Sequence, residues 1–147
     1  MTTIACDGVS ISGDGLVSGD GIIHHQSFEK VRRLPCGAVA GCTGSTYSVE
    51  AAFAFLRGER EGIAFGDEFE AIILHPDGRV ECMNGDGLRY AQPAPCATGS
   101  GAAFALGAMA AGATSGQAVS IACNLNPISG GLVRTLRPTL TPEETLP

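Results

Sequence analysis

Hydrophobic and polar residues alternate with a period of two in several short runs, and turn sequences join these runs in pairs. The alternation predicts antiparallel strand pairs, because successive side chains of a strand point to opposite faces. Asp7-Gly8 and Pro76-Asp77-Gly78 are typical of tight hairpin turns. The predicted pairs are residues 2–6 with 9–12, 28–34 with 38–42, and 70–75 with 79–84. The glycine- and aspartate-rich passage 13–21 is predicted to be a loop with turns.

The period changes to that of a helix after Gly44. Apolar residues then recur three and four positions apart, at Val49, Ala52, Phe53 and Leu56. Ser45 stands where a helix cap is favoured, and Gly58 stands where helices tend to end. The pattern predicts a helix between them with one buried stripe.

Two more helices and a strand are predicted in the second half of the chain. Residues 102–111 are apolar nearly all round, as expected for a helix enclosed between layers. Thr114-x-x-Gln117 has the spacing of a capping box and opens a helix that runs to about Leu125. Residues 132–136 are predicted as a last strand, and the proline-, threonine- and glutamate-rich segment 138–147 as a flexible tail.

This order of elements predicts a single α+β domain over residues 1–137. The expected architecture has two antiparallel sheets, with helices between them that cover their apolar faces. The chain has 147 residues, of which 44% are hydrophobic and 16% charged. That is enough for one packed core and too little for two ordinary domains.

The charge and the cysteines exclude several function classes. The chain has 15 acidic and 9 basic residues, a net charge of -6 and no basic stripe, so neither nucleic acid nor an anionic membrane is expected as partner. With no long apolar run and no secretory signal, a cytoplasmic protein is expected. The six cysteines lack a C-x-x-C pair, and His24-His25 is typical of a surface strand. We therefore expect no disulfide framework, metal or cofactor.

Thr2 is the candidate nucleophile. Removal of Met1 would leave an N-terminal threonine, which carries a hydroxyl nucleophile and a base, its α-amine, on one residue. The pKa of an α-amine is about 7.7–8.0, so part of it is neutral near physiological pH and can accept the hydroxyl proton. Thr2 is expected to attack a peptide carbonyl.

Several local patterns carry a resemblance to a known family. They are Thr2-Thr3-Ile4 followed by a hairpin, Ser12-Gly13-Asp14-Gly15 followed by Lys30-Val31-Arg32-Arg33-Leu34, Ala40-Gly41 ahead of Thr43-Gly44, Gly99-Ser100-Gly101 at a helix start, and Asn126-x-x-Ser129-Gly130-Gly131. Together they span most of the chain. They resemble the N-terminal nucleophile (Ntn) hydrolases of the proteasome β-subunit and HslV type.

The resemblance implies a four-layer αββα sandwich and a threonine peptidase acting on peptides or unfolded proteins. It also implies self-association, as in the rings of this family, and an ATP-dependent unfoldase as a further partner. The implied catalytic residues are Thr2, Asp14, Lys30, Gly41, Ser100, Asn126 and Ser129. The implied substrate pocket consists of Phe28, Val39 and Thr43, which favours apolar side chains.

Each implied residue has a chemical role. Lys30 would keep positive charge beside the nucleophile, and Asp14 would hold the ammonium in place. The amide of Gly41 would bind the oxyanion. Ser100 and Ser129 would orient the amine and a water molecule.

The chain departs from the family pattern in two places. The passage 59–68 is too short for the family's long second helix, which predicts a reduced outer helical layer. Asn126 replaces an aspartate and cannot supply negative charge. Two alternatives stay open: an Ntn amidohydrolase of a small amide, and a catalytically silent ring or scaffold subunit.

Overall fold

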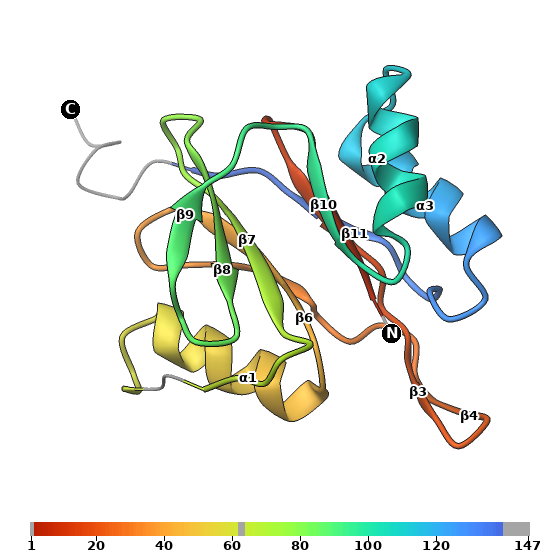
Figure 1. Cartoon of the computed structure of the whole chain (residues 1–147), viewed down its shortest axis with the longest axis horizontal. Helices are drawn as coiled ribbons and strands as arrows, with labels where there is room; N and C mark the ends of the chain where they lie inside the picture. The colour runs from red at the N-terminus through yellow and green to blue at the C-terminus, as the bar shows by residue number, and fades with distance from the viewer. Residues whose placement is uncertain (1, 62–63, 140–147) are drawn as a thin grey trace.

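The structure, a computed structural model, describes residues 2–61 and 64–139. Two antiparallel sheets and a separate hairpin make up its strands (Figure 1). The four-stranded sheet has the order β10 (Cys96–Gly99), β1 (Thr3–Cys6), β2 (Ile11–Gly13) and β11 (Arg134–Leu136). The five-stranded sheet has the order β5 (Val31–Arg33), β6 (Val39–Thr43), β7 (Glu70–Leu74), β8 (Val80–Asn84) and β9 (Arg89–Ala91). The hairpin consists of β3 (Val17–Gly19) and β4 (Ile22–His25).

The two sheets pack face to face, and helices cover their outer faces (Figure 1). The space between the sheets is filled by Ile4, Cys6, Ile11, Val31, Val39, Ile72, Leu74, Val80 and Cys96. α1 (Thr46–Leu56) packs on the five-stranded sheet through a cluster that includes Phe53 and Phe69. α2 (Ala102–Ala110) and α3 (Ser115–Leu125) pack on the four-stranded sheet. The layers are thus helix, sheet, sheet and helices.

The expectation that helices lie between the sheets is wrong. Aliphatic side chains from both sheets fill that space directly, so no helix is needed there. α2 lies on the outside: Ala105 and Met109 are buried, whereas Phe104 is 41% and Leu106 44% exposed. Apolar residues on all sides of α2 predicted that it would be enclosed, but only the side that carries Ala105 and Met109 packs against the rest of the protein.

Local sequence signals for the three helices and three strand pairs are confirmed. The Ser45 side chain accepts from the Ser48 N–H at the start of α1. Thr114 and Gln117 form both bonds of a capping box at the start of α3. The pairs β1–β2, β5–β6 and β7–β8 are antiparallel as predicted, and β11 lies within the predicted last strand.

Several short strands were missed. Part of the predicted loop 13–21 forms β3, because Asp20 (φ 53°) and Gly21 (φ 75°) make a tight turn into β4. His24 and His25 lie on β4 and are exposed, as expected of a surface strand. β9 and β10 are only three and four residues long, too short for an alternation signal.

Between α1 and β7 the described residues form no second helix, in keeping with a reduced outer layer. At the other end of the chain, the Thr139 N–H donates to Gly37 O (2.8 Å). The rest of the predicted tail, residues 140–147, lies outside the described residues.

Candidate active site

Thr2 and Thr3 lie at the start of β1. β1 and β2 are antiparallel with Ile4 opposite Gly13, so the residue that follows β2 returns beside the start of β1. The Thr3 N–H donates to Asp14 Oδ1 (2.9 Å), and the Asp14 N–H donates to Thr3 O (3.2 Å). Thr2, Thr3 and Asp14 are all buried. The hairpin predicted from the sequence therefore brings the predicted aspartate to the threonines.

Lys30 forms a buried ion pair with Asp14. Its Nζ donates to Asp14 Oδ1 (3.1 Å) and to Leu16 O (2.6 Å), and the two side chains are 4% and 0% exposed. The Gly130 N–H donates to the other oxygen, Asp14 Oδ2 (3.1 Å). Burial lowers the pKa of Lys30 below its ordinary value, and the charge of Asp14 offsets part of that effect. A cation is thereby held inside the protein beside the start of β1.

Three polar residues from the second half of the chain complete this network. Asn126, the C-cap of α3, donates through Nδ2 to Ser129 Oγ (2.9 Å) and to Ser100 Oγ (2.9 Å). Ser129 Oγ lies 2.8 Å from Thr3 Oγ1, and the Ser100 hydroxyl donates to Thr2 O (3.3 Å). The structure thus brings together Thr2 and five predicted site residues, namely Asp14, Lys30, Ser100, Asn126 and Ser129.

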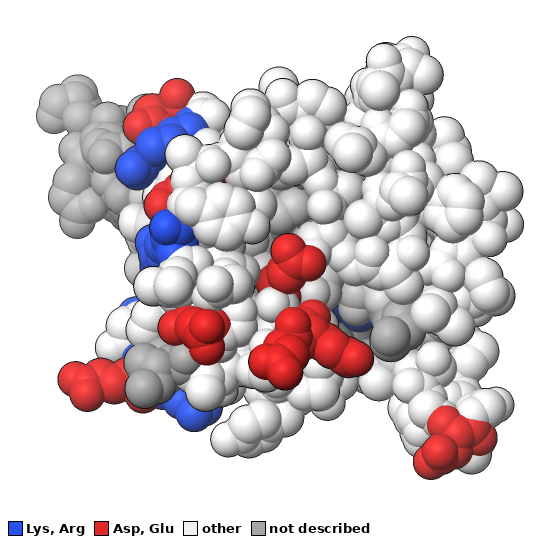
Figure 2. Space-filling view, viewed as in Figure 1, with Lys and Arg blue, Asp and Glu red and all other residues white. Residues whose placement is uncertain are grey.

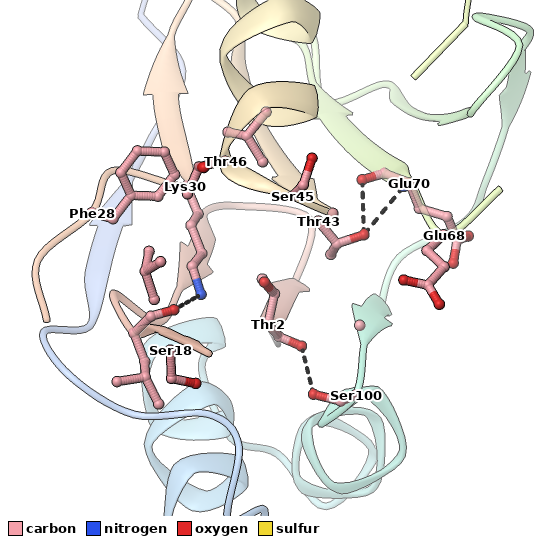
Figure 3. Close-up of a pocket in the computed structure, with 15 residues that line it drawn as sticks. Thr2, Ser18, Phe28, Lys30, Thr43, Ser45, Thr46, Glu68, Glu70 and Ser100 are labelled. Carbon is pink, nitrogen blue, oxygen red and sulfur yellow. Dashed lines mark hydrogen bonds between the residues drawn. The ribbon is translucent and has the colours of Figure 1, made fainter. Parts of the chain in front are cut away.

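A cavity of about 600 Å³ opens beside Thr2 (Figure 3). This volume lies within the range of small-molecule and cofactor sites. Its lining comes from segments spread over the chain: Thr2, Leu16, Val17, Ser18, Phe28, Lys30, Thr43, Gly44, Ser45, Thr46, Val49, Glu68, Glu70, Gly99 and Ser100. Two of the three predicted pocket residues, Phe28 and Thr43, are among them.

Val39 and Gly41 do not lie where the resemblance implied. Val39 is fully buried between the sheets, and a Cβ added to Gly41 would lie 2.6 Å from Ile4 Cγ2 in the same space. The Cys42 N–H donates to Lys30 O, on the β5 side. Because neighbouring strand amides point to opposite sides, the Gly41 N–H points to β7 and stays inside the sheet. A glycine is therefore needed at position 41 because a side chain there would clash with the packing between the sheets. Neither Val39 nor Gly41 lines the cavity.

Gly44 is a glycine that lines the cavity. It follows β6 directly and has a φ of +125°, a conformation that glycine adopts without the strain of a side chain. Since the sheet ends at Thr43, the backbone of Gly44 is not part of the strand ladder. The sequence marks Gly44 only as part of the turn, because it does not reveal at which residue the preceding strand ends.

Two carboxylates on the cavity wall were also missed. Glu70 opens β7 opposite Thr43, whose hydroxyl donates to Glu70 O (3.3 Å) and accepts from the Glu70 N–H (3.2 Å). The Glu70 Oε1 accepts from the Thr98 hydroxyl on β10 (2.9 Å), which ties the two sheets together. Glu68 lies just before it, and both side chains are seen across Thr2 from Phe28 (Figure 3). No motif marks this segment.

Among residues 2–61 and 64–139, no group of three or more His, Cys, Asp or Glu side chains is placed to hold a metal ion. No helix in this part of the chain is long and apolar enough to cross a membrane.

A buried hydroxyl beside an ammonium, next to a cavity, is an arrangement suited to nucleophilic attack on a carbonyl. Thr2 lines the cavity, whereas the hydroxyl of Thr3 is engaged with Ser129. Of the two threonines, Thr2 is the one whose side chain can meet a bound substrate.

Comparisons with solved structures support this fold. No protein-family model and no curated protein sequence matches the chain. Among solved structures, HslV from Trypanosoma brucei is 23% identical with a TM-score of 0.64, covering 93% of this chain and 99% of that chain. Thiobacillus denitrificans BPH is 17% identical with a TM-score of 0.66, covering 96% of this chain and 98% of that chain. A second structure of that protein, in complex with epoxomicin, gives the same identity and TM-score.

These similarities extend over nearly the whole chain. The fold implied by the resemblance is confirmed: the chain has the fold of HslV and of Thiobacillus denitrificans BPH, in a form whose described residues place one helix on the five-stranded sheet.

Proposed function

We propose that the protein is a threonine-type peptidase whose nucleophile is Thr2, freed by cleavage of the bond before it. The observation that carries this proposal is the position of Thr2, at a cavity and within one hydrogen-bond network with Ser100, Asn126 and Ser129. The buried pair of Lys30 and Asp14 lies at the same point. The HslV fold supports the proposal, since that fold agrees with the one implied by the sequence motifs.

In the first step, the free α-amine of Thr2 takes the hydroxyl proton, directly or through a water molecule, and Oγ1 attacks the carbonyl carbon. The positive charge of Lys30 disfavours protonation of the amine and stabilises the developing alkoxide. We assign the oxyanion donor to the backbone N–H of Gly44, which lines the cavity, in place of Gly41.

The tetrahedral intermediate then breaks its C–N bond. The protonated amine of Thr2 gives its proton to the leaving nitrogen, and an ester between Thr2 and the acyl part remains. Water, deprotonated by the same amine, attacks that ester and restores the hydroxyl. Ser100 and Ser129 are the groups that position the amine and this water.

Self-association is part of the proposal. Residues 90–133 contain no Asp, Glu, Lys, Arg or His, and they include both helices of one outer layer. Four large apolar side chains of these helices are 40–58% exposed: Phe104, Leu106, Ile121 and Leu125. Figure 2 shows no charged group on the visible surface over α2 and α3. Because the charges of like sign lie elsewhere, two copies meet with least repulsion through this face.

The intact mass of the protein before and after incubation with epoxomicin tests the proposal. Loss of Met1 and addition of one inhibitor, absent in Thr2→Ala, are the expected results, because the epoxyketone adduct uses both the amine and the hydroxyl. A protein that keeps Met1 and takes up no inhibitor contradicts the proposal and favours a silent subunit. The size of the cavity also suits a small amide. A protein that is labelled by epoxomicin, is monomeric and cleaves no peptide would favour the Ntn amidohydrolase instead.

A further inference from the structure

We infer that the wall formed by Glu68 and Glu70 binds a cationic side chain of the substrate, so that the enzyme cleaves peptides with a basic residue on one side of the scissile bond and an apolar residue on the other. This inference rests on the proposed function and adds a substrate class to it. It replaces the expectation of a purely apolar preference.

The charged residues that line the cavity do not balance one another. Its lining contains three charged residues, namely Lys30, Glu68 and Glu70. The charge of Lys30 is matched by Asp14, which touches it at 3.1 Å and is itself buried. The two glutamates therefore give the cavity its net negative charge, and Figure 2 shows acidic groups gathered over the start of β7.

The wall formed by Glu68 and Glu70 has no counter-ion among the described residues. Elsewhere in the described chain, Glu29, Glu50, Glu59 and Glu81 each pair with an arginine or histidine. Within the same described residues, Glu68 and Glu70 form no ion pair. Glu70 is nevertheless held in place, because Oε1 accepts from Thr98 and its backbone bonds to Thr43. A positioned carboxylate that faces a cavity without a counter-ion is a site for an incoming cation.

The cavity has two different sides. Thr2 lies between an apolar side, which includes Phe28, and the carboxylates (Figure 3). A carbonyl placed at Thr2 has one neighbouring residue on each side. An extended peptide therefore meets the apolar side with one of these residues and the carboxylates with the other.

Matched peptides test the inference. One series carries leucine on one side of the cleaved bond and lysine, glutamine or norleucine on the other, and a second series has the order reversed. We expect kcat/KM for the lysine peptide of one series to exceed that of its glutamine peptide by about tenfold or more, as for a good charge pair. This ratio should fall with added salt, because the glutamates are exposed.

The double variant E68Q/E70Q should bring the lysine-to-glutamine ratio close to one. The amide oxygen that Glu70→Gln introduces can still accept a hydrogen bond from the Thr98 hydroxyl, so this hydrogen bond between the two sheets is kept. Glu61→Gln is the matched control, because Glu61 is exposed and does not line the cavity. A thermal unfolding curve verifies that each variant folds.

The possible failures are distinguishable. If epoxomicin labels Thr2 of the wild-type protein but the lysine-to-glutamine ratio of E68Q/E70Q equals that of the wild type, this inference alone is overturned. Absence of both labelling and cleavage overturns the proposed function.

Discussion

The two sides of Thr2 differ in how many of their polar and charged groups already have a partner within the protein. On the interior side, Asp14, Lys30 and Ser129 are buried and hydrogen-bonded, and no buried polar side-chain atom in the described chain lacks a partner. On the cavity side, Glu68 and Glu70 are exposed and have no counter-ion among the described residues. The polar groups of the interior side are therefore all hydrogen-bonded or ion-paired without substrate, whereas the cavity side has two carboxylates that can still bind a cationic group of a substrate.

This contrast indicates a division of labour. A buried ion pair gains little stability over apolar residues, since desolvation of both charges offsets their attraction. Its value lies in fixed charge that needs no reorganisation when the reaction occurs. The cavity side acts through contacts that form only when substrate arrives, so changes there should alter preference more than rate.

Thr2→Ala removes the proposed nucleophile and should lower peptide turnover by about 10³-fold or more, in the range found when a catalytic nucleophile is deleted. Thr3→Ala should cost far less, because Thr3 Oγ1 contacts Ser129 and does not line the cavity. Turnover of a fluorogenic peptide by both variants is the measurement. The reverse order of effects would identify Thr3 as the reacting residue and end the assignment of Thr2.

Lys30→Met removes the buried cation and should lower turnover by about 10²–10³-fold, as for other electrostatic groups at a reacting centre. It should also lower the free energy of unfolding by about 3 kcal/mol, because Asp14 keeps its backbone donors but loses its counter-ion. Denaturant unfolding and peptide turnover measure the two effects.

Arg79→Met is the matched control for Lys30→Met. Arg79 lies in the turn between β7 and β8 and pairs with Asp77 at the surface, where the side chains are 60% and 69% exposed. A surface pair contributes about 0–1 kcal/mol, and this one is outside the hydrogen-bond network of Thr2. Equal losses of turnover in both variants would show that Lys30 acts only through folding.

The sequence was sufficient to predict the interior side because its residues follow from local structure. A hairpin over β1 and β2 must return Asp14 to Thr3, and the capping box sets the start of α3, the helix that ends at Asn126. Lys30 and Ser129 were then predicted from the strings Lys30-Val31-Arg32-Arg33-Leu34 and Asn126-x-x-Ser129-Gly130-Gly131. Each of these positions depends on short-range chain geometry or on a recognisable string.

The cavity side could not be predicted in the same way. Val39 and Gly41 were misplaced because their position depends on which face of β6 meets the other sheet, and an apolar pattern on both faces does not reveal it. Glu68 and Glu70 come from a polar segment without a motif. They reach the site only because β7 pairs with β6, so that Glu70 lies opposite Thr43.

The pH dependence of turnover gives a smaller and more specific test of the interior side. The pKa of Lys30 is lowered chiefly by burial, so in the folded protein its ammonium should lose its proton at a lower pH than the usual value of about 10.5. As the pH rises through the lowered pKa of Lys30, turnover should therefore fall. The unfolded chain binds more protons there, so the contribution of Lys30 to stability rises with pH while activity falls. Asp14→Asn should move the alkaline limb to lower pH, since Asp14 raises the pKa of Lys30. A limb that stays in place would belong to another group.

Asn126→Asp should have the smallest effect on maximal turnover, a change of less than about tenfold, since the residue acts through Ser100 and Ser129 and not on the substrate. A carboxylate at this position accepts from both serines instead of donating to them, and it adds negative charge near the Thr2 amine. That charge favours the protonated amine, so the acidic limb of the pH–rate profile should move to higher pH. Asn126→Leu, which is uncharged and cannot hydrogen-bond, separates the two causes: it should lower turnover without moving the limb. A shift of equal size in both variants would mean that hydrogen bonding, and not charge, sets the pKa of the base, and the interior side would then control proton transfer through orientation alone.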